Sequence, residues 1–133
     1  MSEWWGVTME GGRVTRLEWD EESLSGTIPS EIGALSALRS LRLCDNELSG
    51  SIPPTIGALT NLESLGQSDN PLSGIVPFTL SNLKNLRGLR LTNTELTYAP
   101  TNYLKSDSVV QDFLYTLWLP QALRFLNHCI AIT

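Results

Sequence analysis

Cys44, His128 and Cys129 are the residues of this chain whose side chains most readily act as nucleophiles or metal ligands. The adjacent His128 and Cys129 cannot provide the four ligands of a structural zinc site. No histidine or basic side chain is expected beside Cys44, so its thiol lacks a group that would activate it. The sequence also has no phosphate-binding glycine loop, no catalytic-triad signature and no zinc-ligand spacing. We therefore predict that the chain is not an enzyme and that it binds no metal and no cofactor.

Acidic side chains recur at intervals of 24 residues, at Glu21, Asp45 and Asp69, and Asn93 occupies the next such position. One interpretation is a binding stripe for a basic peptide or a weak calcium site. The other is a solvated corner at which an aspartate caps a turn. Calcium takes about six to eight oxygen ligands, which these positions alone do not supply. We favour the solvated corner, with a protein-binding edge as the alternative.

The same interval belongs to a repeat that covers most of the chain. Residues 14–37, 38–61, 62–85 and 86–96 align without a gap. Identical residues share columns, which are Leu24, Leu48, Leu72 and Leu96; Gly26, Gly50 and Gly74; and Pro29, Pro53 and Pro77. A period of this length is typical of a solenoid, in which a single coil cannot bury its leucines and stacked coils bury them together.

Each repeat predicts one coil of such a solenoid. Residues 41–43 alternate between apolar and polar side chains, as a half-buried strand does, and Leu38 and Leu48 on either side point inward. Asn46 follows the strand, where its amide can bond backbone groups of the next coil. Residues 56–59 are too short and too glycine-broken for a long helix, so they predict a short helical or 3₁₀ turn on the outer side.

Residues 38–61 carry the pattern LxxLxLxxNxLxGxIPxxIGxLxx, which resembles the plant-type leucine-rich repeat. The resemblance covers about residues 14–100, and Trp5-Gly6-Val7 followed by Gly12-Arg13-Val14 resembles the segment that leads into the first repeat of that family. It implies an α/β solenoid: a short right-handed coil with a parallel inner β-sheet and a helical C-terminal cap. Secreted members usually carry cysteines near this first segment, whereas Met9 stands at that position here.

Two residues depart from the inward column that holds Leu43 and Leu91. Trp19 fills this slot in the first repeat and Gln67 fills it in the third. A buried glutamine must find hydrogen bonds or cost about 1–3 kcal/mol. We interpret Gln67 as a local weak point or a water site.

The chain is expected to divide into an N-terminal cap (1–13), about 3.5 leucine-rich repeats (14–105) and a C-terminal helical cap (106–133). Trp4 and Trp5 are expected to roof the first coil. The helical cap is predicted from apolar residues at helical spacing, which are Val110, Phe113, Leu114 and Leu117. The alternatives are a docking helix for a partner or a membrane, and a poorly ordered tail.

The outward positions of the inner strands form the concave face of such a solenoid. These are the predicted partner-binding residues, namely Arg16, Glu18, Asp20, Glu21, Ser40, Arg42, Cys44, Asp45, Ser64, Ser68, Asp69, Arg90, Thr92 and Asn93. Arg42 and Arg90 flank Gly66, an arrangement that suits a carboxylate or a sugar in a shallow notch, although ordinary surface charge is the interpretation we favour.

The formal net charge of −5 disfavours binding to nucleic acid, which needs lysines and arginines to neutralise phosphates, and to anionic membranes. The N-terminus lacks the basic and apolar regions of a secretory signal. Two cysteines far apart and no glycosylation sequon also favour a reducing compartment. We therefore expect a cytoplasmic location, or an extracellular or membrane-attached one if the chain is a fragment.

The resemblance implies a non-enzymatic protein-recognition module that binds a protein or peptide through its concave face. One alternative is a fragment of a leucine-rich-repeat receptor-like ectodomain or of an inhibitor of a wall-degrading enzyme. Another is a regulatory segment of a larger kinase or GTPase.

Overall fold

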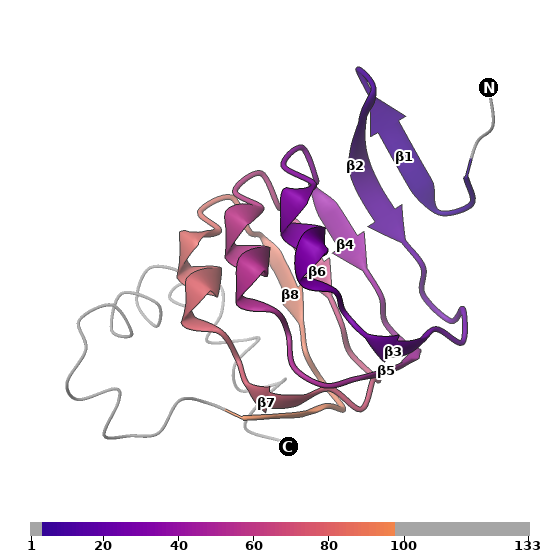
Figure 1. The fold of residues 1–133 in the computed structure, drawn as a ribbon, viewed down its shortest axis with the longest axis vertical. Coiled ribbons are helices and arrows are strands. Elements are labelled where there is room, and N and C mark those ends of the chain that lie inside the picture. Colours follow the sequence, from indigo (N-terminus) through magenta and orange to yellow (C-terminus); the bar gives the residue numbers. More distant parts are fainter. Residues whose placement is uncertain (1–3, 98–133) are drawn as a thin grey trace.

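A computed structural model describes residues 4–97, which form a solenoid of stacked coils (Figure 1). The elements in chain order are β1 (Val7–Glu10), β2 (Arg13–Glu18), β3 (Ser25–Thr27), η1 (Ser30–Ala34), β4 (Ser40–Arg42), β5 (Glu47–Ser49), η2 (Pro54–Ala58), β6 (Ser64–Gly66), β7 (Ser73–Ile75), η3 (Phe78–Asn82), β8 (Gly88–Arg90) and β9 (Glu95–Thr97). The three η elements are 3₁₀ helices.

The inner side of the stack is a five-stranded sheet with the order β1-β2-β4-β6-β8. Strands β2, β4, β6 and β8 are parallel, and β1 pairs with β2 in the antiparallel sense. Leu17, Leu41, Leu65 and Leu89 pair in register across the parallel strands. The repeat thus advances by one coil every 24 residues, which confirms the predicted parallel sheet.

The outer side carries the three 3₁₀ helices, one above another (Figure 1). Each helix follows an extended proline, which ends the preceding segment and sets the direction of the turn. A Cβ atom on Gly57 would lie 2.6 Å from the carbonyl oxygen of Thr79 in the next helix, and one on Gly33 would lie 2.5 Å from that of Thr55. The predicted short outer turn is confirmed, and these two glycines let the turns stack closely.

A second line of short strands joins the two sides. Strands β3 and β5 are paired in parallel, as are β7 and β9, and a single bridge between Gly50 and Leu72 connects the two pairs. Gly26, Gly50 and Gly74 have positive φ angles of 90°, 75° and 86°. This conformation explains why the glycine column recurs, since other residues rarely adopt it.

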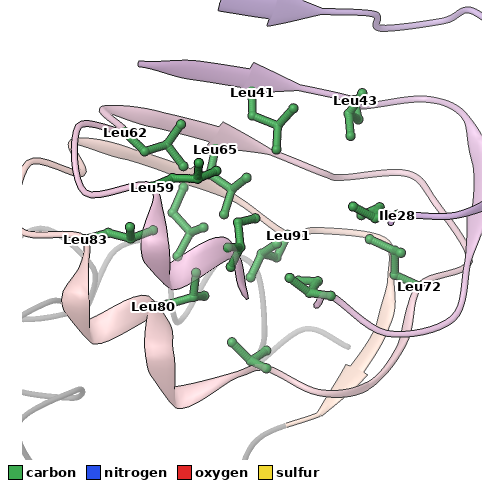
Figure 2. Packing of buried hydrophobic residues seen from close by; sticks show 14 of the residues in the cluster. Ile28, Leu41, Leu43, Leu59, Leu62, Leu65, Leu72, Leu80, Leu83 and Leu91 are labelled. Atoms are coloured by element: carbon green, nitrogen blue, oxygen red, sulfur yellow. The ribbon is translucent and has the colours of Figure 1, made fainter. Parts of the chain in front are cut away.

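The leucine columns fill the space between the two sides (Figure 2). Leu41, Leu65 and Leu72 have no exposed surface, and Leu48 and Leu96 are almost fully buried. Leu24 is only partly buried because it lies in the first coil. Each buried leucine contributes roughly 1.5–3 kcal/mol, so stacking of the coils is the main source of stability.

A ladder of asparagine side chains ties the corners together. The Oδ1 of Asn46 accepts hydrogen bonds from the backbone N–H groups of Glu22 and Leu24, at 2.9 and 3.0 Å. Asn70 repeats this arrangement one coil later. These bonds reach the preceding coil, so the expectation that they reach the next one is wrong. In the last described coil, Thr94 replaces asparagine and its hydroxyl donates within its own coil.

Two expectations about unusual residues had opposite outcomes. Gln67 points into the core, has no exposed surface, and neither atom of its amide has a hydrogen-bond partner in the described part of the chain. Trp4 and Trp5, in contrast, are 71% and 79% exposed, so the expectation that they roof the first coil is wrong. Trp19 lies there instead: its indole touches Gly6, and its Nε1–H donates to the carbonyl of Trp5 at 2.7 Å.

The predicted helical cap (106–133), with His128 and Cys129, lies outside the described residues, as do residues 98–105 of the predicted repeat region. Within residues 4–97 no helix has the length and apolar character needed to cross a membrane.

Candidate partner-binding face

The structure brings the predicted concave-face residues together on the inner sheet. Two columns lie within the strands, where Arg16 pairs with Ser40 and then Ser64, and Glu18 pairs with Arg42 and then Gly66 and Arg90. The ladder continues past the strand ends through backbone hydrogen bonds. The remaining predicted residues occupy that continuation, which are Asp20, Glu21, Cys44, Asp45, Ser68, Asp69, Thr92 and Asn93.

Most of these side chains are exposed or half-buried, but Ser40 and Ser68 are each only 5% exposed. The Oγ of Ser68 accepts hydrogen bonds from the backbone N–H and the hydroxyl of Thr92, at 3.0 and 2.9 Å. The predicted contact residue Ser68 therefore already bonds its own sheet. Ser40 has no such side-chain bond within residues 4–97.

Carboxylates outnumber guanidinium groups among the predicted contact residues by five to three. Two of the guanidinium groups are paired within the face: Arg16 with Glu18 at 3.6 Å, and Arg42 with Asp20 through a close contact. Arg42 thus turns toward Asp20 in the first coil. Arg42 and Arg90 lie on either side of Gly66 in the strand register, as expected, and the guanidinium of Arg42 is paired with Asp20.

The acidic corner positions share an uncommon backbone conformation. Glu21, Asp45, Asp69 and Asn93 have positive φ angles of 57°, 58°, 59° and 53°. Aspartate and asparagine tolerate this left-handed region better than most residues do, so the backbone explains their recurrence at three of the four corners. All four side chains are exposed, and the amide of Asn93 donates to Asp69 at 2.7 Å. Among the described residues no group of three or more acidic, histidine or cysteine side chains is arranged to hold a metal ion.

Cys44 lies half-buried beside Gly66 on this face. Burial is the main cause that raises the pKa of its thiol, and the nearby Asp20 acts in the same direction. A thiol with a raised pKa remains protonated and is a poor nucleophile. A Cβ atom on Gly66 would lie 3.1 Å from the Cys44 sulfur, so this glycine makes room for the thiol.

The sequence interpretation missed a pocket of about 260 Å³ on the same face. Its lining consists of Arg16, Glu18, Arg39, Ser40, Arg42, Glu63 and Ser64. Arg39 and Glu63 come just before strands β4 and β6 and were not counted among the outward positions. The 24-residue repeat was the available signal, since it places these two residues in one column of adjacent coils.

Comparison with known proteins gives consistent matches. The family model described as Leucine Rich Repeat matches residues 37–59. The ectodomain of the receptor kinase SOBIR1 from Arabidopsis thaliana is 42% identical, with 63% of this chain and 46% of that chain covered and a TM-score of 0.62. A chain of the Arabidopsis thaliana BIR3–SERK2 complex is 34% identical, with coverages of 69% and 51% and a TM-score of 0.64.

The ectodomain of the Arabidopsis receptor kinase HAESA, in complex with an IDA peptide hormone ligand, is 31% identical. That match covers 76% of this chain and 18% of that chain, with a TM-score of 0.66. The chain spans about half the length of the SOBIR1 and BIR3–SERK2 chains. Among curated proteins, none matches the chain.

These matches overturn the expected cytoplasmic location, because the similar structures are ectodomains of plant receptors and point to an extracellular location. The expectation was drawn from the absence of a secretory signal and of a glycosylation sequon and from two cysteines that lie far apart in the sequence. In a chain that spans about half of its structural relatives, such absences carry no information about location.

Proposed function

Because the chain is a plant-type leucine-rich-repeat protein, we propose that it is a recognition module that binds an extended protein or peptide segment along its concave face. The register of β2, β4, β6 and β8 is the observation that carries the proposal. Adjacent strands lie about 4.8 Å apart, so outward side chains stand at a regular interval. The packed leucine core beneath keeps that interval constant, and rigidity lowers the ordering cost of binding.

The charges of the concave face favour a partner segment with basic side chains. The carboxylates of Glu21, Asp45 and Asp69 are exposed, and none forms an ion pair within residues 4–97. Cationic groups of a partner can therefore approach them without displacing an internal arginine. Exposed ion pairs contribute little individually, so we expect this face to give specificity more than high affinity.

The similar structures support a place for this module in a larger extracellular protein. The SOBIR1 and HAESA ectodomains belong to receptor kinases, and the HAESA ectodomain is bound to a peptide hormone. By analogy, this chain is part of a receptor-like ectodomain. As part of a receptor kinase, the chain fits two of the alternatives named from the sequence. These are a fragment of a receptor-like ectodomain and a regulatory segment of a larger kinase. The module itself is non-enzymatic.

Selection from a displayed library of random peptides tests the proposal. We expect the peptides that bind the wild-type chain to be enriched in lysine and arginine and to bind the Asp45→Asn/Asp69→Asn variant about fivefold more weakly. Asparagine keeps the left-handed corner conformation, so this variant removes charge without refolding the turn.

The matched control is Glu47→Gln/Glu95→Gln, which removes two exposed carboxylates from β5 and β9, outside the concave face. We expect the selected peptides to bind this control as they bind the wild type. Equal binding of the selected peptides to the wild type and to the Asp45→Asn/Asp69→Asn chain, the corner variant, would contradict the proposed binding face.

A further inference from the structure

The pocket on the concave face is a partly open depression across the inner sheet. Its side chains come from β2, and from β4 and β6 with the residue before each of these two strands, so it crosses three coils. Its volume of about 260 Å³ lies below the roughly 300–1,000 Å³ of sites for drug-sized ligands. It is several times the roughly 30 Å³ that one water occupies in the liquid. The pocket therefore suits one long side chain rather than a separate small molecule.

The ion pairs around the pocket leave the carboxylate of Glu63 unpaired within the described residues. Arg16 is paired with Glu18 at 3.6 Å, Arg39 with Glu10 at 3.5 Å, and Arg42 with Asp20. All three guanidinium groups of the lining are thus already opposed by carboxylates. Glu63 has no ion pair and no side-chain hydrogen bond within the described chain. The lining itself contains three arginines and two glutamates, and Glu63 is its one carboxylate without an ion pair within the described residues.

Two serines supply the polar atoms next to this charge. Ser40 and Ser64 are paired neighbours on β4 and β6, and both line the pocket. The residue Ser40 is 5% exposed, and no side-chain hydrogen bond occupies its hydroxyl among residues 4–97. Because Ser40 lines the pocket, this hydroxyl is available to a group that enters it.

An ammonium group matches this set of acceptors. It is a compact charge with three donors, which suit one carboxylate and two hydroxyl oxygens. A guanidinium presents its donors in a planar fork, whereas an anionic group would meet the unpaired carboxylate of Glu63. We propose that the pocket binds a lysine side chain of the partner segment, held by Glu63, Ser40 and Ser64. This inference rests on the proposed function and names the contact that anchors the segment.

Titration of the full chain with short synthetic peptides, followed by amide chemical shifts in NMR spectra, tests the pocket. The probes are Ser/Gly pentapeptides with blocked ends and a central lysine, norleucine or glutamate. We expect the lysine peptide to shift the amides of Ser40 and Ser64 and to bind about tenfold more tightly than the norleucine peptide. Equal binding of these two peptides, tighter binding of the glutamate peptide, or no shift at these amides would overturn the proposal.

Two variants check which residues carry the effect. Glu63→Gln keeps the shape of the side chain, and we expect it to weaken binding of the lysine peptide about tenfold, whereas Glu47→Gln on β5 leaves binding unchanged. Ser40→Ala should weaken it by a smaller factor. A Glu63→Gln chain that binds the lysine peptide like wild type would refute the pocket. That result would leave the peptide-library test of the concave face unaffected. The lysine pocket and the proposed recognition function can therefore fail separately.

Discussion

The second and third coils, residues 38–61 and 62–85, have the same backbone plan but bury different side chains. Each contains an inner strand, an asparagine corner, a positive-φ glycine and a 3₁₀ helix. The inward slot after the strand holds Leu43 in the second coil and Gln67 in the third. Both side chains are buried, although only the leucine suits an apolar interior. The comparison shows that stacking of whole coils determines the backbone and that single side chains adjust the stability.

The largest effect is expected when a charge is placed in the shared leucine column. Leu65 has no exposed surface, and Leu65→Asp buries an unpaired carboxylate, so we expect a loss above about 4 kcal/mol and an unfolded chain. Ser64→Asp puts the same group one residue away on the outward side and should be nearly neutral. Circular dichroism melts check both variants, and similar melting temperatures would refute the inward and outward assignment.

The asparagine ladder should rank next. Asn70→Ala leaves buried backbone groups of the second and third coils without their side-chain partner, including the N–H of Leu48 and the carbonyl of Leu43. We expect a loss of about 2–4 kcal/mol in the free energy of unfolding. Asn61→Ala removes one exposed bond, to the carbonyl of Ser36, and should cost less than about 1 kcal/mol. Urea denaturation measures both, and equal losses would show that the corner contributes no more than the surface.

The exchange of the two inward side chains tests the comparison directly. Gln67→Leu removes two unsatisfied amide atoms from the core, so we expect the protein to gain about 1–3 kcal/mol. Leu43→Gln should lose stability, because it introduces the same fault into the second coil. Denaturant midpoints provide the measurement. A destabilised Gln67→Leu chain would indicate that the amide has a partner in solution.

An effect of similar size is expected in the outer turns. Gly57→Ala forces a methyl group against Thr79, so we expect a loss of about 1–3 kcal/mol. The third coil already carries a buried Ser81 at the equivalent position, and Ser81→Gly should change stability by less. Thermal unfolding distinguishes the two variants. A neutral Gly57→Ala would mean that the second and third turns separate at little cost.

Several features of the site depended on neighbours that the sequence pattern does not identify. The outward columns from Arg16 to Asn93 followed from the period alone, because a gapless repeat leaves one register for parallel strands. The sequence did not identify Arg39 and Glu63 as residues of this face, because they precede the strands. Whether a long side chain at such a position reaches the face depends on the packing around it. The ion pair of Arg42 with Asp20 depends on a side chain of the neighbouring coil, which the repeat pattern does not identify. The exposure of Trp5 likewise depends on how the first coil packs.

The periodic sequence by itself determined the architecture: the coil, the parallel sheet, the leucine core, the glycine bends and the outer 3₁₀ turns. Each of these is a local preference repeated at a constant interval, and repetition makes the preferences agree. Only the tertiary structure decided the direction of the asparagine bonds, the isolation of the Gln67 amide and the pocket beside Glu63. These features depend on distances between side chains of different coils, which a residue's type and position in the repeat do not specify.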